Sequence, residues 1–154
     1  MIDTPHIVET SSQLTAYIHL TVPRSSIHEV MGPAIGELMA AVAAQGISPA
    51  GPLFSHHLKM EPELFDFEIS LPVAAPVTAA GRVQPGQLPA AKVARTIYHG
   101  PYEGLGAAWG EFSGWIEANG YSHAPDLWEC YLAGPESSAD PADWRTELNR
   151  SLTG

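Results

Sequence analysis

One predicted strand, residues 126–132, carries side chains that could do chemistry. Strand alternation places Glu129 and Tyr131 on the same face. A strand carboxylate among aromatic and apolar neighbours is costly to bury without a partner, so burial would either raise its pKa or require a cation beside it. The residues alone leave two interpretations open. Glu129 is either a structural acid, solvated on an exposed sheet face or paired across strands with Arg95 or Lys92, or the polar centre of a ligand site.

Other templates for catalysis or cofactor binding do not fit the sequence. His56 and His57 are adjacent in a predicted strand, so their side chains point to opposite faces and do not chelate one metal. The sequence has no glycine-rich phosphate loop. Cys130 is the only cysteine and reads as a packed small apolar residue. We therefore expect no metal and no cofactor.

The elements that position Glu129 occur twice along the chain. A shift of 74 residues aligns residues 14–58 with residues 88–132 without a gap and pairs Gly46 with Gly120. The same alignment places Tyr102 opposite His28. It also makes Ser55 and His57 the equivalents of Glu129 and Tyr131, because those pairs are likewise 74 residues apart.

Each copy has the pattern of one helix among three strands. In the first copy apolar residues recur at helical spacing before Gly46, and the second copy repeats this before Gly120. Because proline breaks a helix interior, the first helix is expected to begin near Pro33. The predicted strands are residues 15–21, 52–58 and 65–71 in the first copy and 92–98, 126–132 and 144–150 in the second.

This order predicts an α+β fold from a duplicated β-α-β-β unit with pseudo-twofold symmetry. We expect one antiparallel sheet, one main helix in each half and a ligand cleft between the halves. The chain would form a single domain, residues 1–154. Its two repeats would span about 7–73 and 82–152, joined by a connector rich in Pro and Ala at 74–81.

Composition excludes several classes of function. The 154 residues include 17 acidic and 7 basic side chains, which gives a net charge of -10. Direct nucleic-acid binding is therefore not expected, whereas cationic ligands are favoured. The single cysteine permits no internal disulfide, and no signal peptide or membrane span is apparent. We expect a cytoplasmic monomer or weak dimer.

Several longer motifs carry a family resemblance. They are Gly51-Pro-x-Phe54, His99-Gly-Pro-Tyr102-Glu-Gly-Leu, Trp128-Glu-x-Tyr-Leu and Asp140-Pro-Ala-Asp-Trp144. With these motifs in this order the chain resembles the GyrI-like small-molecule-binding domain, the effector-binding domain of AraC-type and MerR-type multidrug regulators. The resemblance implies a cleft for bulky, flat, cationic aromatic compounds, with an acid at Glu129 as the central polar contact. It therefore favours the ligand-site interpretation of Glu129. His57 stands where the family pattern has Tyr.

The leading functional prediction is a stand-alone protein that binds or sequesters hydrophobic, aromatic or cationic small molecules. Because the chain starts almost at its first strand, we expect no DNA-binding helical domain in it. Trp115 and Tyr102 would either wall the cleft or cover a domain edge. The predicted ligand-binding residues are Glu129, Tyr131, His57, Phe54, Ser55, Trp109, Trp115, Tyr98 and Tyr102.

Two other functions are also consistent with the sequence. The first is a hydrolase, since some stand-alone members of the family open the cyclopropane ring of DNA-alkylating cyclopropylindole compounds. In that case Glu129 would activate water, with Tyr98 or Tyr102 donating a proton. The second alternative is a protein-interaction module, because some members of the family engage DNA gyrase.

Overall fold

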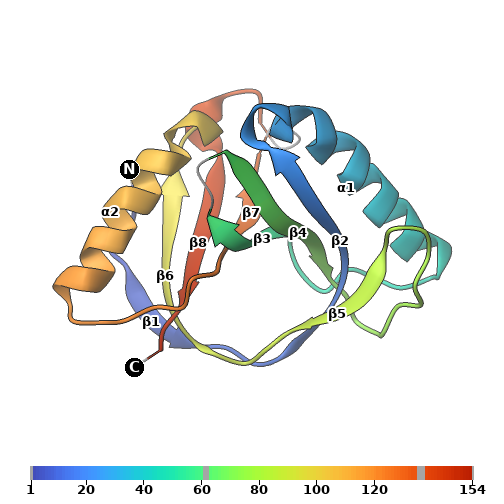
Figure 1. Ribbon diagram of the computed structural model, residues 1–154, viewed down its shortest axis with the longest axis horizontal. Coiled ribbons are helices and arrows are strands. Elements are labelled where there is room, and N and C mark those ends of the chain that lie inside the picture. The colour runs from blue at the N-terminus through green and yellow to red at the C-terminus, as the bar shows by residue number, and fades with distance from the viewer. Residues whose placement is uncertain (1, 61–62, 135–137, 154) are drawn as a thin grey trace. The chain divides into compact units, whose positions relative to one another are not determined.

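A computed structural model describes residues 2–60, 63–134 and 138–153. The chain divides into two units (Figure 1). Unit 1 comprises Met1–Thr10 and Ala91–Gly154, and unit 2 comprises Ser11–Ala90. Each unit has four described strands, all antiparallel, and one main helix. The predicted α+β class, with antiparallel strands and one main helix in each half, is confirmed.

In unit 2, helix α1 (Ile27–Ala44) packs against one face of the sheet. The strands in spatial order are β3 (Phe54–Met60), β4 (Leu64–Pro72), β2 (Gln13–Pro23) and β5 (Gln84–Leu88). Alternate residues of β2 and β4 enter the core, where Ile18 and Ile69 meet Leu38 of the helix. The residues between them along each strand face away from α1.

In unit 1, helix α2 (Leu105–Ala118) covers the sheet in the same way. The strands in spatial order are β1 (His6–Glu9), β6 (Lys92–His99), β8 (Arg145–Ser151) and β7 (Leu127–Ala133). Phe112 and Ile116 of α2 pack on Leu148 of β8, and all three side chains are fully buried. The apolar stripe predicted for this helix is therefore its core face.

Each unit contains one short strand that comes from the other half of the sequence. β1 precedes β2 along the chain but pairs with β6, and β5 precedes β6 but pairs with β2. Consequently the units change at residues 10–11 and 90–91. The repeat limits of about 7–73 and 82–152 are drawn from sequence similarity, and they stay a prediction.

The start of the first helix differs from the prediction. α1 begins at Ile27 and runs through Pro33 to Ala44. Proline cannot donate to the carbonyl of Glu29, but both residues are exposed, so water can satisfy that carbonyl. Ile27 packs against the core and holds the first turn in place.

The extra turn also changes the repeat alignment before the helices. Gly46 and Gly120 have positive φ values of 68° and 76° and lie 74 positions apart, as predicted for helix ends. The helices begin 78 positions apart, however, at Ile27 and Leu105, so α1 is one turn longer. Upstream of the helices the ungapped alignment is therefore wrong. The short 3-10 helices Arg24–Ser26 and Tyr102–Gly104 correspond to each other instead. None of the described helices is long and apolar enough to cross a membrane.

Candidate ligand-binding site

The pairing of β7 with β8 determines which face of the sheet carries the Glu129 side chain. Glu129 lies opposite Leu148 and Tyr131 lies opposite Thr146. Because Leu148 belongs to the core under α2, Glu129 and Tyr131 share the helix-covered face of unit 1. The register shifts immediately after Tyr131. The strand therefore presents these two side chains together and then bends away.

Glu129 is a buried carboxyl group whose described hydrogen bonds come from neutral donors. It is 9% exposed, and Trp109 Nε1 donates to its Oε1 at 2.9 Å. Burial raises the pKa of Glu129, while the hydrogen bonds from Trp109 and Tyr131 act to lower it. The interpretation of Glu129 as a solvated acid is therefore wrong. Arg95, its suggested partner, pairs with Glu147 at 3.3 Å.

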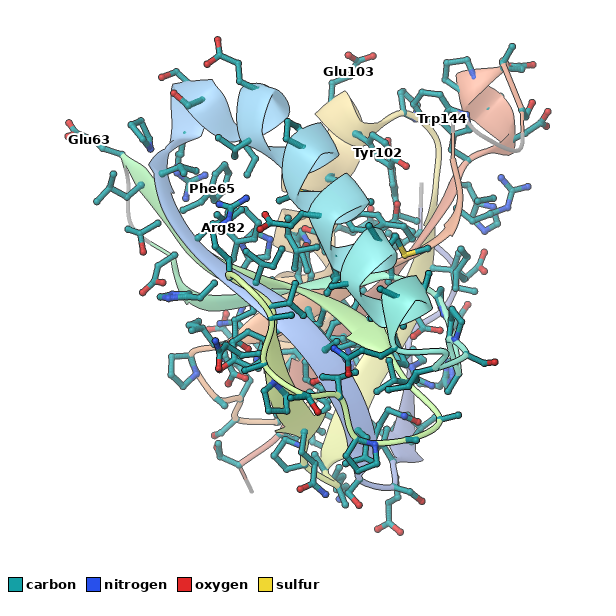
Figure 2. The ribbon with its side chains drawn as sticks, turned by 90° about the vertical axis from the view of Figure 1, so that its right-hand side faces the viewer. Glu63, Phe65, Arg82, Tyr102, Glu103 and Trp144 are labelled. Atoms are coloured by element: carbon teal, nitrogen blue, oxygen red, sulfur yellow. The ribbon has the colours of Figure 1, made fainter. Side chains whose placement is uncertain are left out.

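Aromatic rings extend from the acid along one side. The Tyr131 ring meets Tyr102 edge to face, with centroids 6.0 Å apart. Tyr102 also lies against Trp144 at 5.0 Å, and Figure 2 shows these two rings side by side. Trp144 is fixed by its own Nε1, which donates to the carbonyl of Ser138 at 3.0 Å. We call Tyr102, Tyr131 and Trp144 the aromatic wall.

Thr146 is a site residue that sequence reasoning missed. Its side chain is fully buried opposite Tyr131, and its Oγ1 has no hydrogen-bond partner among the described residues. A buried hydroxyl without a partner is costly, so it is suited to a ligand's polar atom. Strand alternation predicts the face of Thr146, because Trp144, Thr146 and Leu148 occupy alternate positions.

The structure places Tyr98 and Trp115 in other surroundings. The Tyr98 hydroxyl donates to the carbonyl of Pro101 at 2.9 Å and so braces the turn before α2. Trp115 stacks on Tyr121, with ring centroids 6.2 Å apart. It lies six positions after Trp109, about 120° around the helix, and therefore on the opposite flank of the core face. There Trp115 lines a separate pocket with Glu111 and residues 2–5.

Three predicted site residues lie on β3 of unit 2 and divide between its two faces. Ser55 and His57 lie opposite Ile69 and Phe67, and Phe67 and Ile69 belong to the core under α1. Ser55 Oγ lies 3.2 Å from His57 Nε2, and the His57 ring stacks on Phe67 at 5.2 Å. Phe54 alternates to the other face, where it lines a different pocket.

His57 is an uncharged imidazole at neutral pH. It is 8% exposed, and burial is the main cause that lowers its pKa to about 4. Its Nδ1 has no partner among the described residues. This nitrogen can therefore form one hydrogen bond with a polar group that reaches it, and the neutral ring adds no charge to the site.

The depressed pKa predicts how His57 affects stability. The unfolded chain protonates His57 near pH 6.5 and the folded chain only near pH 4. Protonation of His57 therefore favours the unfolded chain as the pH falls below 6.5. The free energy of unfolding is expected to drop by about 3 kcal/mol between pH 6.5 and pH 4. His57→Phe removes this loss, since a phenyl ring keeps the stacking but does not titrate.

Denaturant unfolding of the wild type and His57→Phe between pH 4 and 7.5 measures the difference. The matched control is His6→Gln, because His6 is exposed. We expect the control to follow the wild-type profile. An unchanged pH profile in His57→Phe would show that His57 is not the group that titrates.

Comparisons with known proteins agree with this architecture. A family model for the GyrI-like small molecule binding domain matches residues 3–149. Comparison with curated protein sequences gives no match. Among solved structures, the EcmrR C-terminal domain is similar at 23% identity and a TM-score of 0.86, covering 97% of each chain. The chain spans 57% of the EcmrR chain in a complex with DNA.

Two more distant structures share the fold. A hydrolase from Listeria innocua has 12% identity and a TM-score of 0.70, over 97% of this chain and 91% of that one. SAV2435, solved with bound tetraphenylphosphonium, has 13% identity and a TM-score of 0.67, over 99% and 95%. At these identities the likeness shows the fold alone. The family match over nearly the whole chain goes further, and the chain belongs to the GyrI-like small molecule binding domain family.

Proposed function

We propose that the chain binds hydrophobic aromatic cations and withdraws them from solution. The observation that carries this proposal is the buried Glu129 carboxyl group, which receives hydrogen bonds from Trp109 and Tyr131. Both donors are neutral, so the group's charge is not compensated by them. A ligand cation would supply that compensation. Unit charges 4 Å apart attract by about 4 kcal/mol at an effective dielectric constant of 20.

The aromatic wall fits the apolar part of such a ligand. The rings of Tyr102, Tyr131 and Trp144 present faces and edges at different angles. Aromatic faces attract cations and stack on flat ligands without demanding one shape. This combination suits a class of lipophilic cations better than a single compound. The SAV2435 structure with tetraphenylphosphonium supports the same class of ligand for the family.

Binding is favoured over hydrolysis by the position of Tyr98. Its hydroxyl is already engaged by the carbonyl of Pro101, so it is a poor proton donor to a substrate. The binding proposal predicts that a cyclopropylindole compound is recovered unchanged after incubation with the protein. Steady formation of a ring-opened product would instead favour the hydrolase.

The direct test is a calorimetric titration with tetraphenylphosphonium. The matched control ligand is triphenylphosphine oxide, which has similar rings but no charge. We expect saturable binding of the cation with one site and at least tenfold weaker binding of the neutral molecule. Equal affinities for the two would contradict a site centred on a carboxylate.

A further inference from the structure

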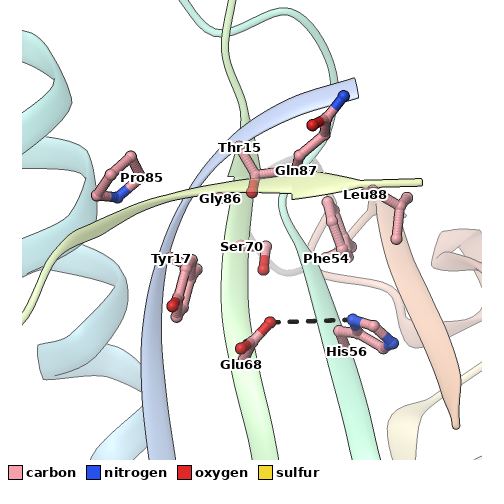
Figure 3. A pocket seen from close by; sticks show the side chains of 10 residues that line it. All are labelled: Thr15, Tyr17, Phe54, His56, Glu68, Ser70, Pro85, Gly86, Gln87 and Leu88. Carbon is pink, nitrogen blue, oxygen red and sulfur yellow. Dashed lines mark ion pairs between the residues drawn. The ribbon is translucent and has the colours of Figure 1, made fainter. Parts of the chain in front are cut away.

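A second pocket lies within unit 2, on the sheet face that points away from α1. Figure 3 shows it bounded by side chains of β2, β3 and β4, with β5 passing across one side. Its volume is about 230 Å³. By this measure a single water molecule needs about 10–15 Å³, so the pocket has room for a molecule much larger than one water. It can hold a molecule with one ring.

The acid in this pocket is Glu68 of β4. His56 lies opposite it in the register, and His56 Nδ1 is 3.9 Å from Glu68 Oε1. Partial burial raises the pKa of Glu68, whereas the neighbouring His56 and His19 act to lower it. A contact of 3.9 Å is too long for a hydrogen bond. The carboxyl group therefore keeps capacity for a closer cationic donor.

Aromatic and hydroxyl groups stand beside the acid. Tyr17, Ser70 and Phe54 form one row across three strands, because Ser70 is the register partner of both aromatic residues. This row is two residues from Glu68 along β4 and shares its face. Phe54 and Ser70 are only 3% exposed, whereas Tyr17 is half-buried, so a ligand whose charged end reaches Glu68 would place its apolar part against Tyr17.

Gly86 shows how closely β5 approaches this row. A Cβ atom at Gly86 would lie 2.7 Å from Tyr17 Cδ1 and 2.8 Å from Thr15 Oγ1. Neither distance is allowed for a real side chain, so the strand can pass here only with glycine. The close approach packs β5 onto the Tyr17 ring and defines one edge of the pocket.

We propose that this pocket binds a small organic cation with one ring, of the arylalkylammonium class, with its ammonium group on Glu68 and its ring against Tyr17. An anion would be repelled by the carboxylate, and a neutral ring would leave Glu68 without a charged partner. The proposal does not depend on Glu129, which belongs to unit 1.

The test is an NMR titration with 2-phenylethylammonium, following the backbone amides of Gly86 and Ser70. We expect saturable shifts in the wild type and about tenfold or more weaker binding in Glu68→Gln, as for the loss of one charged hydrogen bond. Glu63→Gln is the matched control, because Glu63 is an exposed acid of the same unit. The neutral analogue 2-phenylethanol should bind at least tenfold more weakly than the cation.

The Glu129→Gln variant distinguishes this pocket from the site of the proposed function in unit 1. In Glu129→Gln the shifts at Gly86 and Ser70 should be unchanged, whether or not that variant binds tetraphenylphosphonium. If Glu68→Gln does not fold, Tyr17→Leu replaces it and should weaken binding severalfold by removing one ring. Unaltered affinity in Glu68→Gln, or in Tyr17→Leu where that variant is used, would overturn the proposal, as would the absence of saturable shifts at both amides.

Discussion

Glu129→Gln lowers the affinity for tetraphenylphosphonium about a hundredfold or more, the usual cost of removing one partner of a buried charge pair. The amide has nearly the same shape as the carboxyl group, and its oxygen can still accept the hydrogen bond from Trp109 Nε1. The charge is lost, and one acceptor oxygen becomes an NH2 group. Calorimetric titration of the two proteins with the same cation measures the effect.

The folded state should tolerate this substitution. Because burial disfavours the ionised form of Glu129, the neutral amide is expected to leave the free energy of unfolding at pH 7 unchanged or to increase it. Loss of binding in a protein of equal or greater stability separates function from folding. Glu117→Gln is the control, since Glu117 is an exposed acid on helix α2 of the same unit. Wild-type affinity in Glu129→Gln would remove this residue from the site.

Gly104→Ala destabilises the protein by about 2–3 kcal/mol, the range for forcing extra atoms into a packed position. The added Cβ would overlap the Tyr98 hydroxyl and lie 3.0 Å from Tyr98 Cζ. Tyr98 cannot move aside easily, because it is buried and its hydroxyl is bonded to Pro101. Denaturant unfolding of the purified variant measures the change.

Two comparisons isolate this steric cause. Gly110→Ala, on the exposed side of α2 with open space around it, should gain about 0.5–1 kcal/mol from helix propensity. In a Tyr98→Phe background the Gly104→Ala penalty should be smaller, because the overlapping oxygen is gone. An equal penalty in both backgrounds would contradict the overlap as the cause.

Periodicity explains why most elements could be predicted from the sequence. The apolar stripes of both helices and the alternation of the long strands report which faces are buried, and the face of Glu129 follows from the same rule. Gly46 and Gly120 could be predicted as helix ends because both positions require a positive φ. These features depend on local chain geometry, which the sequence records directly.

Features that depend on solvent exposure or on distant pairing could not be predicted in the same way. Pro33 does not mark the start of α1, because the carbonyl it leaves without a donor faces solvent and the helix continues through it. β1 and β5 have only four and five residues, too few to show a clear alternation, and each pairs with a strand of the other repeat. Their partners are fixed by tertiary structure.

The candidate site was predicted in part for a similar reason. Alternation identified Glu129 and Tyr131 together, but the hydrogen bond from Trp109 depends on how α2 packs on the sheet. The unpartnered hydroxyl of Thr146 appears only once every neighbour is placed. Sequence alone treated Phe54 as one of a set with Ser55 and His57, although alternation puts it on the other face.

The binding site can be located directly in a crystal structure of the protein with tetraphenylphosphonium. We expect the cation within about 6 Å of the rings of Tyr102 and Tyr131, the reach of a cation–aromatic contact, and beside the Glu129 carboxylate. We also expect that Glu129→Gln crystals soaked in the same solution lack the cation at this position. A cation bound elsewhere, with Glu129 still in contact only with Trp109 and Tyr131, would contradict the central claim.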